Sequence, residues 1–138
     1  MLKIQQFVFG PVQENTYILY DEASREAAIV DPGCMCHSEE DRVRDFIEEH
    51  ELTPVMLLCT HQHFDHVWGA AFVLRQWPHI KAYGNRIDFE KLPLPSEQLK
   101  GYGIPLPLED VPMERYTLVQ QDDLIRLGSE ELRVLFVP

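Results

Sequence analysis

The feature that most constrains the fold of this chain is an apolar run that leads directly into a cluster of histidines. Residues 55–59 are Val-Met-Leu-Leu-Cys, and residues 60–66 are Thr-His-Gln-His-Phe-Asp-His. A short, uninterrupted apolar run is typical of a strand that is covered on both faces, as in a sheet flanked by helices. The histidine cluster is therefore predicted to lie at the carboxyl end of a buried strand.

The spacing of this cluster suits metal binding. His61 and His63 are two residues apart in a segment that follows a strand, so both imidazoles can face one metal ion. Asp65 and His66 are adjacent at the entry to a predicted helix and can face a second ion. Two ions about 3.5–4 Å apart can activate water and polarise a carbonyl, which is the chemistry of hydrolysis. A histidine-rich surface loop is the alternative, but four ligand residues between a strand and a helix favour a metal site.

The spacing of apolar residues and the positions of turn residues divide the rest of the chain into short strands and two helices. One helix is expected to begin at Ser38, with Asp41 completing a capping box, and the other to cover residues 66–77. Residues 92–112 contain five prolines and are expected to form an irregular loop or excursion. Further strands are expected at residues 2–9, 15–20, 26–31, 79–83, 115–120, 123–127 and 131–137.

Composition limits the partners and the location. The chain has 12 basic and 23 acidic residues, a net charge of −11, which disfavours nucleic acid and anionic membranes as partners. We recognise no membrane-spanning run and no secretory signal. Three cysteines, an odd number, favour free thiols in a reducing cytoplasm. A soft metal site at Cys34, Cys36 and His37 is a less favoured interpretation than ordinary loop residues.

The pattern His-x-His-x-Asp-His at residues 61–66 closely resembles the metal motif of the metallo-β-lactamase superfamily. Gly10-Pro11 followed by residues 14–17, Glu-Asn-Thr-Tyr, resembles the first hairpin of its glyoxalase II-like members. Residues 30–33, Val-Asp-Pro-Gly, resemble the acidic turn before their first helix. The resemblance implies an α+β fold, the αββα sandwich, with two metal ions in a groove at its edge. Zn²⁺ is the expected metal, with Fe and Mn as alternatives.

The resemblance also implies roles for individual residues. His61 and His63 would bind the first ion, and Asp65 and His66 the second, with Asp65 also handling a proton as the catalytic residue. Asp31 would lie beside the site and support the ligands. The implied small-molecule substrate is a thioester, such as a glutathione conjugate, attacked by a metal-bound hydroxide. Two alternatives remain open: an iron-dependent persulfide dioxygenase of the same superfamily, and a catalytically inactive fragment that self-associates.

Residues 1–138 are predicted to form a single domain that is incomplete at its C-terminus and contains the first half to two-thirds of the sandwich. The family pattern continues with a third histidine in a Pro-Gly-His context, a bridging aspartate and a further histidine, and none of these is found here. Residues 132–138 resemble the strand before that third histidine. We therefore expect an active parent enzyme, but weak metal binding and little activity in this chain. We also expect a homo-oligomer formed through the open face of the sheet.

Overall fold

The computed structural model describes residues 1–135, and its centre is a six-stranded mixed sheet. The first three strands pair antiparallel and the last four pair parallel. This sheet, with helices packed on it, confirms the predicted α+β class. In spatial order the strands are β1 (Leu2–Phe9), β2 (Glu14–Asp21), β3 (Glu26–Val30), β4 (Thr53–Cys59), β5 (Lys81–Asn85) and β6 (Tyr116–Val119).

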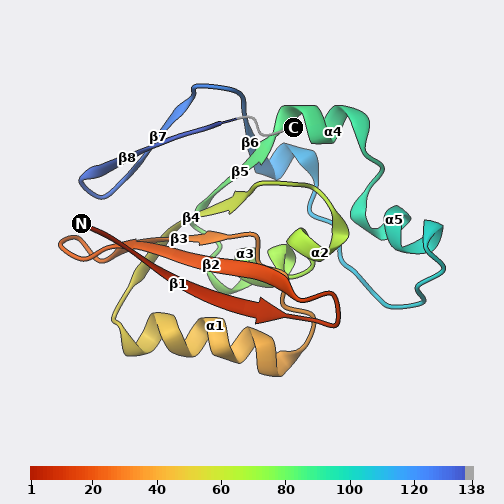
Figure 1. Cartoon of the computed structure of the whole chain (residues 1–138), viewed down its shortest axis with the longest axis horizontal. Helices are drawn as coiled ribbons and strands as arrows, with labels where there is room; N and C mark the ends of the chain where they lie inside the picture. The colour runs from red at the N-terminus through yellow and green to blue at the C-terminus, as the bar shows by residue number, and fades with distance from the viewer. Residues whose placement is uncertain (136–138) are drawn as a thin grey trace.

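Different elements cover the two faces of this sheet (Figure 1). Helix α1 (His37–Glu49) packs its buried residues into the cluster on one face, together with residues of α3 (Ala70–Gln76). Strands β7 (Leu124–Leu127) and β8 (Glu130–Arg133) form a hairpin over the other face. The described residues therefore form a helical layer, the main sheet and a second, two-stranded sheet.

Strand β4 lies between the two cores, which explains its continuous apolar run. Leu57 is fully buried in the cluster under α1, whereas Met56 belongs to the cluster under the β7–β8 hairpin. Its parallel neighbours β3 and β5 pair with it on both sides, so neither edge of β4 is exposed. The prediction of a buried central strand at residues 55–59 is confirmed. The loop that follows this strand begins at the edge of the sheet where β4 ends.

The predicted helix at residues 66–77 is helical over most of its length, but it is divided into two shorter helices. Helix α2 (Phe64–Val67) ends before Gly69, and α3 begins at Ala70. At the break, the Gly69 amide donates to the Pro32 carbonyl at 2.7 Å, and a Cβ on Gly69 would lie 2.3 Å from Cys34 Sγ. Contact with the Pro32–Cys34 turn therefore interrupts the helical pattern and requires glycine there.

Two further expectations are corrected. Helix α1 begins at His37, and neither its N-cap Cys36 nor Ser38 forms the predicted capping box, because Asp41 pairs with Arg44 instead. Residues 92–112 are less irregular than expected, because they contain α5 (Pro95–Gly101), with Pro95 in its first turn. Helix α4 (Arg86–Lys91) precedes this segment and was not predicted.

The last predicted strand, residues 131–137, is shorter in the structure. Strand β8 ends at Arg133, and residues 136–138 lie outside the described residues. None of the helices in residues 1–135 is long and apolar enough to span a membrane.

Candidate metal centre

The four predicted ligands gather beyond the carboxyl end of β4. His61 and His63 lie in the loop after the strand, and Asp65 and His66 lie in α2. The ring centroid of His61 is 5.6 Å from that of His63 and 5.2 Å from that of His66. Asp65 Oδ2 lies 3.8 Å from Nε2 of His66. Three imidazoles and a carboxylate therefore share one small region, and this set of donors suits zinc or a similar divalent ion.

Asp31, which was expected only to support the ligands, lies close enough to His61 and His66 to share a metal ion with them. One donor atom each from Asp31, His61 and His66 all lie within 4.8 Å of one another. His63 and Asp65 do not belong to this tightest group, although both are next to it. The backbone of Asp31 has a positive φ of 50°, which directs the chain out of β3 and into the turn before α1. The donors present could therefore hold a divalent ion with Asp31 either beside it or as a ligand.

The carboxylate of Asp31 also organises the loop around it. Its Oδ1 accepts a hydrogen bond from the Thr60 amide at 2.7 Å, and its Oδ2 accepts one from the Thr60 hydroxyl. Nδ1 of His66 lies 3.1 Å from the same Oδ2, and this hydrogen bond is the main reason that the pKa of His66 is raised. With Nδ1–H donated to Asp31, Nε2 of His66 is left as the atom available to a metal.

Glu14 is a member of the site that the sequence analysis did not identify. Its side chain is 1% exposed, and its Oε1 lies 3.8 Å from His66 Nδ1 with no hydrogen-bond partner among the described residues. Burial raises the pKa of Glu14 to about 7. The sequence analysis quoted Glu14 only as part of the hairpin resemblance at residues 14–17, and that resemblance gave it no role in the site.

The hydrogen bonds around Thr16 agree with a protonated Glu14. Thr16 Oγ1 lies 2.7 Å from Glu14 Oε2 and 2.8 Å from the Asp31 carbonyl oxygen, and it accepts a hydrogen bond from the Gly33 amide. A hydroxyl has one hydrogen to donate, and a carbonyl oxygen can only accept. Both oxygen contacts are satisfied together when Thr16 donates to Asp31 and a protonated Glu14 donates to Thr16.

Helices α4 and α5 brace the histidine loop through polar side chains. The Gln62 amide donates to Asp88 Oδ2 at 2.9 Å, and the Phe64 amide donates to Gln98 Oε1 at 3.0 Å. Nε2 of Gln98 donates to the Gln62 carbonyl at 2.8 Å. The backbone on both sides of His63 is therefore held by Asp88 of α4 and by Gln98, which lies in the segment 92–112 that was expected to be irregular.

Replacing Gln98 by alanine is expected to loosen the histidine loop. The change removes one acceptor and one donor from the backbone of residues 62–64, so divalent metal should bind roughly tenfold more weakly. Hydrogen exchange at the Gln62 and Phe64 amides measures the loosening of the loop, and zinc titration measures the change in metal affinity. Gln76→Ala is the matched control, because Gln76 contacts Arg44 on the far helix layer. Equal zinc affinity in the two variants would contradict the bracing role.

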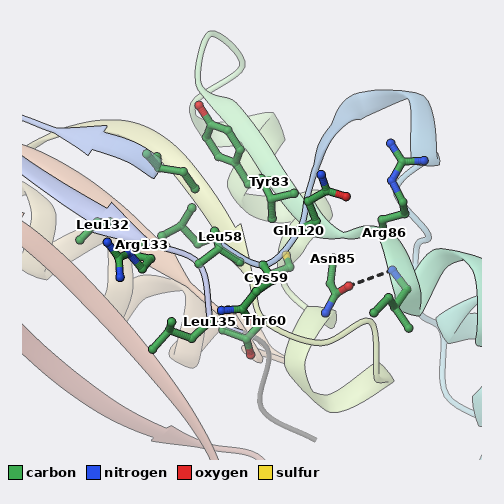
Figure 2. A pocket seen from close by; sticks show the side chains of 15 residues that line it. Leu58, Cys59, Thr60, Tyr83, Asn85, Arg86, Gln120, Leu132, Arg133 and Leu135 are labelled. Atoms are coloured by element: carbon green, nitrogen blue, oxygen red, sulfur yellow. Dashed lines mark hydrogen bonds between the residues drawn. The ribbon is translucent and has the colours of Figure 1, made fainter. Parts of the chain in front are cut away.

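A cavity of about 560 Å³ lies beyond the ends of β4, β5 and β6, on the side of the β7–β8 hairpin (Figure 2). Tyr83 of β5 lines this cavity. Thr60 connects it to the histidine loop, and Arg86 and Arg133 are its basic residues. A mostly apolar cavity that contains two arginines therefore lies on one side of the metal motif.

The alternative soft metal site at Cys34 and Cys36 is not assembled in the structure. Cys34 is buried and Cys36 is exposed, and within residues 1–135 neither belongs to a group of three or more converging ligands. Cys59 is buried in β4, in agreement with its predicted place in the core. All three cysteines are free.

Comparisons with known proteins agree with this arrangement. The family model of the metallo-β-lactamase superfamily matches residues 9–138. The chain is 31% identical over 137 residues to the probable metallo-hydrolase YqgX of Bacillus subtilis, covering 99% of the chain and 61% of the relative. It is 32% identical over 130 residues to the hydroxyacylglutathione hydrolase GloC of Haemophilus influenzae, covering 91% and 56%. The crystal structure of the BLEG-1 B3 metallo-β-lactamase superposes with a TM-score of 0.76 at 25% identity, covering 99% and 62%.

The chain therefore belongs to the metallo-β-lactamase superfamily, and its described part has the metallo-β-lactamase fold. It is similar to hydroxyacylglutathione hydrolases within that superfamily. The chain spans about three-fifths of the length of these relatives.

Proposed function

We propose that this chain contributes the first part of the active site of a metal-dependent hydrolase that cleaves a thioester, such as a glutathione conjugate. The observation that carries the proposal is the convergence of His61, His66 and Asp31 beyond β4, with His63 and Asp65 beside them. The similarity to a hydroxyacylglutathione hydrolase supports the thioester as the substrate class.

In this proposal His61, His63, Asp65 and His66 are the metal ligands. Zn²⁺ is the expected ion, and Fe or Mn can use the same donor types. A divalent ion held there supplies positive charge that activates water and polarises a carbonyl group. Asp31 holds Nδ1 of His66, which directs Nε2 of that ring toward Asp65 and the ion.

Asp65 is the proposed catalytic residue. Its side chain is 27% exposed, so its carboxylate is accessible to a substrate and can exchange protons with water. Its Oδ2 faces Nε2 of His66 at 3.8 Å, which places it beside the proposed metal position. We infer that this carboxylate accepts a proton from the attacking water or returns one to the leaving thiolate.

The test is hydrolysis of S-lactoylglutathione and related thioesters by the whole protein that carries this chain. Zinc-dependent release of free thiol, reduced about 100-fold or more by Asp65→Asn, is expected. Thioester hydrolysis unaffected by Asp65→Asn would contradict the catalytic role. Iron in the purified protein, with oxygen consumption on a persulfide and no thioester hydrolysis, would favour the dioxygenase alternative instead.

We further infer a cytosolic location and self-association of the chain when it is isolated. The three free cysteines support a reducing compartment. Edge strand β1 exposes Ile4 and Val8 by 66% and 48%, and these side chains offer an apolar surface to a second copy. Light scattering is expected to give a dimer or larger species at micromolar concentration, and a monomer at all concentrations would refute the association.

A further inference from the structure

Two neighbouring hollows that share lining residues lie beside the metal motif, on the side of α5 and the β1–β2 turn. The wider hollow, of about 520 Å³, is bounded by His63 of the motif and by Tyr102 after α5. The smaller hollow, of about 100 Å³, lies between the β1–β2 turn, α2 and the loop after α5. Phe64, Asp65 and Ile104 line both hollows, so the proposed catalytic carboxylate borders them both.

The smaller hollow is apolar apart from two carboxyl groups. Its charged or titratable lining groups are Glu14 and Asp65, and no lysine, arginine or histidine lines it. This lining offers no positively charged side chain to an anionic group, such as a glutathione carboxylate, whereas the cavity beside the β7–β8 hairpin carries two arginines. Its other lining residues include Val12, Phe64, Trp68, Ile104 and Leu106.

Several apolar side chains around this hollow are unusually accessible. Val12 is 57% exposed and Leu106 is 50% exposed, and both lie at its rim. Tyr102, which lines the wider hollow, is 74% exposed, and its ring centroid is 5.8 Å from that of Phe64. A rim of this kind beside a charged motif gives an apolar ligand a surface to bury.

We infer that the smaller hollow binds the acyl side chain of the substrate and selects a short, branched aliphatic group. The inference rests on the proposed thioester hydrolysis, because Asp65 connects the hollow to the reacting carbonyl. A volume of about 100 Å³ is less than the roughly 150 Å³ of a cavity that accommodates benzene, so an isobutyl-sized group fits and a phenyl ring does not. Most of the lining is apolar, so burying the hydroxyl of a hydroxyacyl group there costs desolvation free energy that an aliphatic group avoids.

Binding of uncharged acyl analogues tests the hollow without requiring catalysis. Isovaleramide is expected to shift the NMR signals of the Trp68 indole and the Leu106 methyl groups, with a dissociation constant about tenfold lower than that of lactamide. Leu106→Ala and, separately, Val12→Ala should weaken isovaleramide binding several-fold. Leu124→Ala is the control, because Leu124 is similarly exposed, at 59%, on the distant β7 strand. Equal affinity for the two amides, or binding that shifts neither residue, would overturn the inference.

Kinetics on the whole protein then separates the hollow from the proposed function. With acyl thioesters of one thiol, kcat/KM should be highest for isobutyryl or isovaleryl and at least about tenfold lower for benzoyl, and Trp68→Ala should narrow that gap. Hydrolysis at rates independent of the acyl group would overturn the acyl site while leaving the hydrolase proposal intact. If no thioester is hydrolysed, the proposed function fails, and the amide titration alone decides whether the hollow binds an apolar group.

Discussion

Replacing Asp31 by alanine is expected to weaken divalent metal binding by about 10- to 100-fold and to lower the free energy of unfolding by about 2–4 kcal/mol. The carboxylate accepts hydrogen bonds from the Thr60 amide, the Thr60 hydroxyl and His66 Nδ1, and it is almost completely buried. Alanine removes this acceptor from all three donors, although the Thr60 hydroxyl keeps a contact with His61 Nδ1 at 3.0 Å. It is also strained at the positive φ of this position. Zinc titration and urea unfolding measure the two effects.

Asp31→Asn separates the charge from the shape of the side chain. Asparagine tolerates a positive φ and can still accept a hydrogen bond from the Thr60 amide, so most of the stability should remain. It removes the negative charge that raises the pKa of His66, so that pKa should fall, and an NMR titration of the ring measures it. An unchanged pKa of His66 in this variant would show that Asp31 does not control the ring.

Replacing Glu14 by glutamine is expected to stabilise the metal-free protein at pH 8 by up to about 3 kcal/mol and to have little effect at pH 4. The pKa of Glu14 is about 7 in the folded protein and 4.5 in the unfolded chain. As the pH rises, the unfolded chain therefore loses this proton before the folded protein does. The contribution of Glu14 to stability is therefore fully present below pH 4.5 and is lost as pH rises through 7. Glutamine stays neutral, and its amide can donate to Thr16 as the protonated acid does.

Urea unfolding at several pH values, with metal removed by a chelator, measures this effect. Glu22→Gln is the control, because Glu22 lies exposed in the turn after β2 and changes the net charge equally. Parallel stability curves for the wild-type protein and Glu14→Gln between pH 4 and 8 would contradict a buried, protonated Glu14.

The parts of the fold that the sequence predicted are those in which local pattern and tertiary packing agree. The apolar run at residues 55–59 predicted a buried strand, and parallel pairing on both sides with cores on both faces explains why every residue there is apolar. The break at Gly69 was missed, because apolar spacing continues across it and only contact with Pro32 and Cys34 reveals the need for glycine. Helix α5 was missed, because proline was taken as a breaker where Pro95 occupies the first turn.

The residues of the candidate site likewise fall into those that the sequence predicted and those that only the structure reveals. The motif residues are adjacent in the sequence, so their spacing alone predicted that they gather beyond β4. Glu14 and Gln98 reach the site only through tertiary contacts, one from a hairpin and one from α5, and neither has a distinctive sequence pattern. Asp31 lies between these cases, because a resemblance predicted its position beside the ligands but not its place within the tightest group of donor atoms.

The most direct test of the central claim is a cobalt(II) titration of the whole protein that carries this chain, followed by the visible absorption of the bound ion. Saturable binding is expected, with an absorption spectrum that changes when His61, His63, Asp65 or His66 is replaced by alanine. Binding should weaken as the pH falls, because the raised pKa of His66 makes a proton compete with the metal at that ring. Saturable binding that all four substitutions leave unchanged, or no binding above that of a histidine-free control protein, would contradict the assignment of residues 61–66 as a metal centre.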